Sequence, residues 1–128
     1  MKGRNAKAHI VTLNKEALAT LELARQFRRS ATELIFPSRS SRELSDMALS
    51  SFMDNLYGTP HGFRSSFRDW AAEKMPHIPD PVAEAALAHK VSNKVVAAYK
   101  RTAFLEMRRI LLDEWGGFAG GGMEKIIE

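Results

Sequence analysis

The sequence contains no cysteine in its 128 residues, which excludes disulfide frameworks, thiolate zinc sites and cysteine nucleophiles. Long hydrophobic runs are also missing. The longest uninterrupted apolar stretch extends from Val95 to Tyr99, far short of the roughly 20 residues that a membrane-spanning helix needs. The start of the chain, Met1 to Asn5, is polar and has no apolar signal-peptide core. We therefore expect a soluble cytoplasmic protein without a membrane partner.

Sequence patterns for metal, hydrolytic and nucleotide sites are absent as well. The histidines form no His-x-x-x-His pair, which disfavours zinc, and no Gly-x-Ser-x-Gly elbow of a serine hydrolase occurs. The glycine-rich run 116–122 lacks the preceding strand and the following Lys-Ser/Thr of a phosphate-binding loop. We expect no metal, no cofactor and no small-molecule ligand.

Length and composition are those of one globular domain. The chain is 45% hydrophobic and 27% charged, with a formal net charge of +4. A sequence pI near 9.6 is compatible with a polyanionic partner. Because the charge surplus is modest, the positions of the cationic residues matter more than their number.

The hydrophobic pattern predicts a mainly α-helical fold. His9 to Leu13 is short and β-branched, as in a strand, and the turn at Gly3-Arg4-Asn5 suggests the second arm of an N-terminal β-hairpin. Capping residues and apolar spacing predict the helices that follow. They extend from Asn14 to about Arg28, from Ser45 to Gly58, from Thr59 to about Lys74, from Asp80 to His89, from Ser92 or Asn93 to Tyr99, and from Thr102 to about Trp115. Residues 1–118 then form the domain, and residues 119–128 form a flexible tail.

The helix after Pro60 carries a candidate phosphate site. At 100° per residue, His61, Arg64 and Arg68 share one face, and Phe63, Phe67 and Trp70 lie nearly opposite. An isolated His-x-x-Arg is more often a solvated polar face. However, free N–H groups and the positive dipole end of a first helical turn favour an anion, and arginine adds a fork that matches phosphate oxygens.

A second cluster follows at Leu87-Ala88-His89-Lys90 and at Tyr99-Lys100-Arg101. Taken alone, His89 at a helix end is usually a C-terminal capping cation. Likewise, Tyr99 after an apolar run is more often a core residue. Neither segment indicates a function by itself.

The three segments together resemble the active-site boxes of tyrosine recombinases, in particular phage and genomic-island integrases. The resemblance is carried by Thr59-Pro60-His61-Gly62-Phe63-Arg64, Leu87-Ala88-His89-Lys90 and Ala97-Ala98-Tyr99-Lys100-Arg101, and it extends over residues 1–118. It implies the helical C-terminal part of a catalytic domain and a bacterial, nucleoid-associated protein.

The resemblance also implies the role of each matched residue in site-specific recombination of double-stranded DNA. Tyr99 would attack the scissile phosphodiester and form a 3′-phosphotyrosyl link. Arg64, His61 and His89 would bind the phosphate oxygens, and Lys2, or its rival Lys7, would protonate the leaving 5′-oxygen. Further DNA contacts are expected from Arg68, Lys90, Lys100 and Arg101.

One element of the family pattern has no match. The first active-site arginine of these recombinases lies in a helix before the hairpin, and this chain contains no such segment. We expect the chain alone to cleave DNA poorly or not at all, as an incomplete and inactive fragment. The alternative function is a non-enzymatic helical module that binds DNA or another protein.

The last helix bears on oligomerisation. Phe104, Met107, Leu111 and Trp115 recur at helical spacing and form one apolar stripe. We expect the stripe to pack on its own domain. In similar recombinases this region engages a neighbouring protomer, so the intact protein could form a homo-oligomer, a synaptic tetramer.

Overall fold

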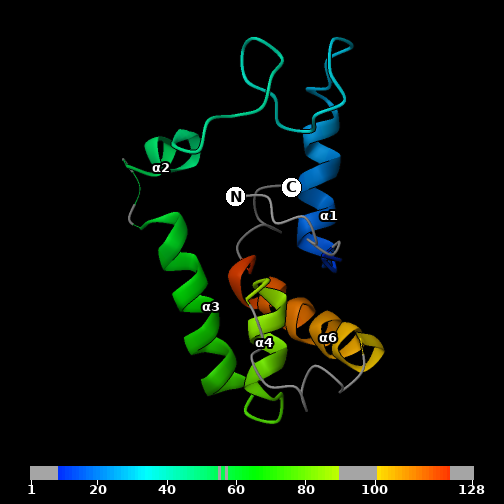
Figure 1. The fold of residues 1–128 in the computed structure, drawn as a ribbon, viewed down its shortest axis with the longest axis vertical. Coiled ribbons are helices and arrows are strands. Elements are labelled where there is room, and N and C mark those ends of the chain that lie inside the picture. Colours follow the sequence, from blue (N-terminus) through cyan, green and yellow to red (C-terminus); the bar gives the residue numbers. More distant parts are fainter. Residues whose placement is uncertain (1–8, 55, 57, 90–100, 122–128) are drawn as a thin grey trace, which may run out of the picture.

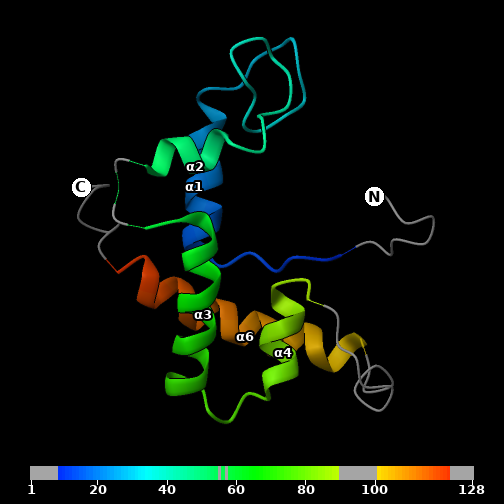
Figure 2. The ribbon, with the colours of Figure 1, turned by 60° about the vertical axis from the view of Figure 1, so that its left-hand side comes forward.

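The computed structural model describes residues 9–54, 56, 58–89 and 101–121. Its helices are α1 (Lys15–Arg25), α2 (Ala48–Met53), α3 (Pro60–Lys74), α4 (Asp80–Ala86) and α6 (Arg101–Ala119). Helices α3, α4 and α6 pack together in the lower part of the molecule, and α1 and α2 lie above them (Figures 1 and 2). The mainly helical fold expected from the sequence is confirmed.

The hydrophobic core lies where α3, α4 and α6 meet. Phe67, Val82 and Leu111, one from each helix, are almost completely buried. Trp70 of α3 completes an aromatic contact with Trp115 of α6, whose ring centroid lies 5.3 Å away in an edge-to-face geometry. This core fixes the side of α3 that faces α4.

The apolar stripe of α6 packs on its own domain. Leu111 is buried, and Phe104, Met107 and Trp115 pack against the core cluster. The aromatic contacts extend to Phe118, whose ring stacks on Trp70 at 5.8 Å. The stripe is therefore occupied by intramolecular contacts.

Apolar residues between α1 and α3 are mostly exposed. Phe27, Met47 and Phe52 are 78%, 65% and 71% accessible, and only Met53 of α2 is buried. The connection between α1 and α2 lies far from the core in both views (Figures 1 and 2). Apolar spacing in this part of the sequence therefore does not correspond to burial.

Side-chain caps define the starts of two helices as predicted. The Asn14 side chain accepts a hydrogen bond from the Ala17 N–H at 2.8 Å, and the Thr59 hydroxyl accepts one from the Gly62 N–H at 2.9 Å. Pro60 occupies the first turn of α3. Both starts need only contacts within three residues, which explains why the sequence predicts them.

Other boundaries differ from the predictions. Helix α1 ends at Arg25, α2 begins at Ala48 without a side-chain cap, and α4 ends at Ala86 rather than near His89. The expected helix that ends at Tyr99 lies outside the described residues.

The predicted β-hairpin is not seen, and no strand occurs in the described residues. His9 to Leu13 has no partner strand there. Instead, the Ile10 carbonyl accepts a hydrogen bond from the Arg108 side chain of α6 at 3.0 Å. A strand requires a ladder of backbone hydrogen bonds, and residues 1–8, which would supply the other arm, lie outside the described residues.

Helix α6 continues through Gly116 and Gly117, beyond the end expected near Trp115. Gly116 is buried where α1 crosses α6, and a Cβ atom at this position would lie 2.4 Å from Nδ2 of Asn14. The same Nδ2 donates to the Leu112 carbonyl at 2.7 Å. Glycine at position 116 is thus required by the close approach of α1.

Gly116→Ala is expected to lower the free energy of unfolding by about 1–2 kcal/mol, because the new methyl group displaces the Asn14 side chain from its cap and from Leu112. Gly117→Ala is the matched control. A Cβ there meets no atom within 4 Å, so alanine should stabilise the helix by about 0.5–1 kcal/mol. Urea denaturation followed by circular dichroism measures both values, and equal effects would contradict the packing of α1 on α6.

Candidate phosphate-binding site

The site is built where the C-terminal end of α4 meets α3. Arg64 of α3 is half-buried, and its Nη2 donates a hydrogen bond to the Leu87 carbonyl at 2.9 Å. Leu87 is the C-cap of α4, so this carbonyl is one of those that the helix leaves without an internal partner. Arg64 therefore ties α3 to the end of α4.

A tight turn after α4 then places His89. Ala88 has a positive φ of 58°, its N–H donates to the Ala85 carbonyl at 3.1 Å, and the His89 N–H donates to the Glu84 carbonyl at 2.9 Å. These two bonds define a Schellman motif. The turn folds His89 back over the last turn of α4, toward Arg64.

His89 contacts α3 and α4 at once. Its Nε2 is hydrogen-bonded to Nη2 of Arg64, and its Nδ1 lies 2.5 Å from Oε2 of Glu84. A guanidinium can only donate and a carboxylate can only accept. When the imidazole is neutral, its proton must therefore be on Nδ1, and Nε2 must be the acceptor from Arg64.

Glu84 connects His89 to a second arginine. Its Oε1 pairs with Nε of Arg68 at 2.8 Å, and Arg68 also lies 3.9 Å from a carboxylate oxygen of Asp80. The hydrogen bond from His89 is the largest cause and lowers the pKa of Glu84. Burial comes second and raises this pKa, and the charges of Arg68, His89 and Arg64 lower it further. We call Arg64, Arg68, Glu84 and His89 the Arg64–His89 cluster.

The cluster leaves cationic donors available to an anion. Within the described ranges, Nε and Nη1 of Arg64 have no hydrogen-bond partner.

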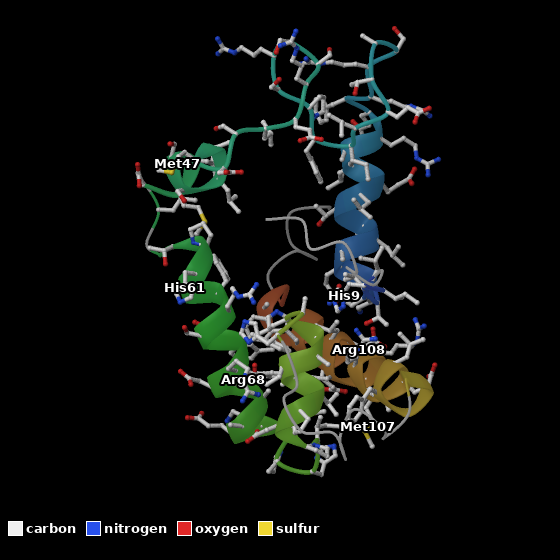
Figure 3. The ribbon with its side chains drawn as sticks, viewed as in Figure 1. His9, Met47, His61, Arg68, Met107 and Arg108 are labelled. Carbon is white, nitrogen blue, oxygen red and sulfur yellow. The ribbon has the colours of Figure 1, made fainter. Side chains whose placement is uncertain are left out.

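Arg68 is already paired, and its side chain is 26% exposed. Figure 3 shows Arg68 between α3 and α4. The predicted cationic face of α3 is thus partly covered by α4 rather than fully solvated.

His61 lies at the N-terminal end of α3, away from the labelled Arg68 (Figure 3). Its side chain is exposed, and in the part of the chain that the structure describes it forms no hydrogen bond or ion pair. His61 and Arg64 are three positions apart in sequence and so lie on one side of the helix. Phe63 shares a helix face with Phe67 and Trp70, but it is 58% exposed because the first turn of α3 extends beyond the core.

Several predicted site residues cannot be located. Lys2, Lys7, Lys90, Tyr99 and Lys100 lie outside the described residues. Arg101 begins α6, and only its backbone is described. The structure therefore brings Arg64 and His89 together and does not describe the position of the tyrosine.

Glu84 was missed by the sequence analysis. Its two contacts depend on the turn at Ala88 and on the position of α4 beside α3, neither of which follows from local spacing. A weak signal exists, since Arg64 and Arg68 are one helical turn apart and an acidic residue is the natural counter-ion on the helix that covers them.

The described residues contain no group of three or more histidine, aspartate or glutamate side chains that could hold a metal ion. Nor do they contain a helix with the length and hydropathy needed to cross a bilayer.

Comparison with known proteins supports an integrase family for the chain. It is 34% identical over 113 residues to "Prophage integrase IntA" of Escherichia coli strain K12, an alignment that covers 84% of this chain and 27% of that relative. The chain thus spans about a quarter of the length of the curated relative. No protein-family model matches the chain. No solved structure matches it either.

Glu84 should make stability depend on pH in the acid range. Because its pKa is lowered in the folded state, its stabilising effect is complete above the unfolded value of about 4.3 and is lost as the pH falls through the folded value. Denaturation midpoints should therefore differ most between the parent and Glu84→Gln near neutrality and converge in acid. The exposed Glu73→Gln serves as control, and a difference independent of pH would contradict the pairing.

Ala88→Gly tests the turn that places His89. A left-handed backbone costs an alanine roughly 1 kcal/mol, and glycine adopts it freely. We expect the substitution to raise the free energy of unfolding by up to about 1 kcal/mol, measured by urea denaturation. A loss of stability would show that the turn has a different backbone conformation in solution.

Proposed function

We propose that this chain is part of a site-specific DNA recombinase that cleaves and rejoins DNA strands through Tyr99. The observation that carries the proposal is the contact between Arg64 and His89, which are 25 residues apart in sequence. Two segments that resemble separate boxes of one recombinase active site meet at a cationic cluster suited to a phosphate. The similarity to a prophage integrase supports the same function.

In the proposed reaction, the Tyr99 hydroxyl gives up its proton, for which His61 is the proposed acceptor, and its oxygen attacks the phosphorus of the scissile phosphodiester. The bond from phosphorus to the 5′-oxygen breaks, and the 3′-phosphate becomes linked to Tyr99. The departing 5′-oxygen takes a proton, for which Lys2 is the proposed donor. Attack by a 5′-hydroxyl on the phosphotyrosyl link reverses these steps, so rejoining needs no external energy source.

Arg64 would stabilise the charge that develops on the non-bridging oxygens of the phosphate. Both N–H groups of its Nη2 are engaged by Leu87 and His89 in this structure. A bidentate contact with phosphate therefore requires Nη2 to release one partner. Release of His89 would also let its Nε2, once protonated, donate to the same phosphate.

The remaining predicted residues would guide the DNA. His61 is exposed one turn before Arg64 and can reach the same anion from the N-terminal end of α3. Lys90, Lys100 and Arg101 would contact neighbouring phosphates. For Arg68, a DNA contact would compete with its ion pair to Glu84. Because the chain spans 27% of its relative, the complete reaction is proposed for a protein that contains this segment.

Covalent capture on a nicked duplex tests the nucleophile. We would replace the matching 113-residue segment of the E. coli integrase by this chain and incubate the chimera with a nicked duplex carrying the prophage attachment sequence. Cleavage next to the nick frees a short strand that diffuses away, so the phosphotyrosyl adduct accumulates. The unmodified chimera should form an adduct on a denaturing gel, and Tyr99→Phe should abolish it.

Tyr57→Phe is the matched control, since Tyr57 is the other tyrosine of the chain. It should retain the adduct. An adduct with Tyr99→Phe would refute the assigned nucleophile. A chimera that binds the duplex but forms no adduct would favour the alternative, a DNA-binding module whose affinity simply falls with salt.

Arg64→Lys tests the role of the guanidinium. Lysine keeps the charge but cannot form the planar fork, so we expect the single-turnover rate of capture to fall about 10²- to 10³-fold. The affinity for the duplex should change little, because one of many phosphate contacts is retained. A rate close to that of the parent would exclude Arg64 from the transition state.

A further inference from the structure

We infer that Glu84 is the positioning residue of the Arg64–His89 cluster: one carboxylate oxygen holds Arg68, and the other holds the Nδ1–H of His89, so that Nε2 faces Arg64. The effect of Glu84 on strand transfer rests on the proposed function. Its effect on the His89 ring does not.

The geometry of the carboxylate supports this role. Oε1 and Oε2 of Glu84 take different partners, one from α3 and one from the turn after α4. Arg68 fixes the carboxylate from one side, so the oxygen offered to His89 has a defined position. A ring held at Nδ1 can rotate less than a free imidazole, and the orientation of Nε2 follows from that contact.

The backbone acts together with the side chain. The His89 N–H donates to the Glu84 carbonyl at 2.9 Å, in the same residue pair that shares the side-chain hydrogen bond. Residues 84 and 89 are therefore connected twice across one turn. Arg64 closes the arrangement from α3 through Leu87 and His89.

The arrangement has a consequence for phosphate binding. In the structure, Nε2 of His89 accepts a hydrogen bond from Arg64. The two groups proposed to bind one phosphate are therefore bonded to each other. When a phosphate draws Arg64 away, Glu84 keeps the imidazole in place, and Nε2 stays directed at the anion, to which it can donate once it is protonated. Without Glu84, displacement of Arg64 would leave the ring free to rotate.

Nitrogen NMR of the 128-residue chain tests the positioning directly. Ring nitrogens coupled to the imidazole C–H protons distinguish the two neutral tautomers. At about pH 8, where an ordinary histidine is neutral, we expect His89 to carry its proton on Nδ1. In Arg64→Ala, where no donor holds Nε2, this proton should stay on Nδ1. Adding Glu84→Ala to Arg64→Ala should give a mixture of tautomers, and adding Glu84→Gln instead, which keeps an acceptor for Nδ1–H, should be intermediate.

Asp80→Asn is the matched control, because it removes a carboxylate near Arg68 from the same helix but has no contact with His89. It should leave the tautomer unchanged. Alanine at position 84 lies inside α4 and favours the helix, so Glu84→Ala should remain folded. An Nε2–H tautomer in the parent chain, or a tautomer that does not change when Glu84→Ala is added to Arg64→Ala, would overturn the inference.

Capture rates in the integrase chimera test the consequence for strand transfer. We expect Glu84→Ala to slow single-turnover capture about 10-fold or more, with Glu84→Gln intermediate and Asp80→Asn within about twofold of the parent. DNA affinity should be unchanged in all three. Equal losses in Glu84→Ala and Asp80→Asn, or a tautomer shift without a change in rate, would overturn the positioning role. An adduct that persists in Tyr99→Phe would refute the proposed nucleophile and leave the NMR result standing.

Discussion

The packing of α4 against α3 is the constraint on which the site depends. Val82 and Ala83 of α4 are buried in the core shared with Phe67 of α3, and this apolar contact determines which residues of α3 lie beside the end of α4. The cationic residues Arg64 and Arg68 are on that side. Burial of a few aliphatic and aromatic groups thus decides the position of the polar cluster.

The polar contacts of the Arg64–His89 cluster then fix the orientation of side chains whose positions follow from the core. Arg64 donates to a helix-end carbonyl, and Glu84 pairs with Arg68 and His89, so each side chain of the cluster has at least one partner. Such contacts add little to stability when exposed to water. Their larger effect is to fix directions, and the fixed direction of Nε2 on His89 is the feature most relevant to binding an anion.

The predictability of each element follows from how local its causes are. The start of α3 needs only Thr59, Pro60 and Gly62, and the sequence predicts it correctly. The strand at His9 to Leu13 needs a partner segment, and β-branched residues alone do not supply one. The need for glycine at position 116 of α6 comes from the approach of Asn14 at the start of α1, which no local pattern encodes.

The residues of the candidate site also divide into those that local sequence indicates and those that depend on tertiary contacts. Arg64 and His89 could be proposed from spacing and resemblance, because their residue types match the chemistry of phosphate binding. Glu84 could not, since its role depends on the left-handed turn at Ala88 and on the packing of two helices. The packing of α4 against α3 also explains Arg68. A helical projection assigns Arg68 to a cationic face, and the structure shows it in an ion pair with Glu84.

The central claim is that Arg64 and His89 act together on one phosphate. A double-mutant cycle on the rate of covalent capture, with Arg64→Ala, His89→Ala and the double variant, measures their coupling most directly. The account predicts strong non-additivity, so that His89→Ala costs much less once Arg64 has been removed. Losses that multiply as if the two residues were independent would contradict it.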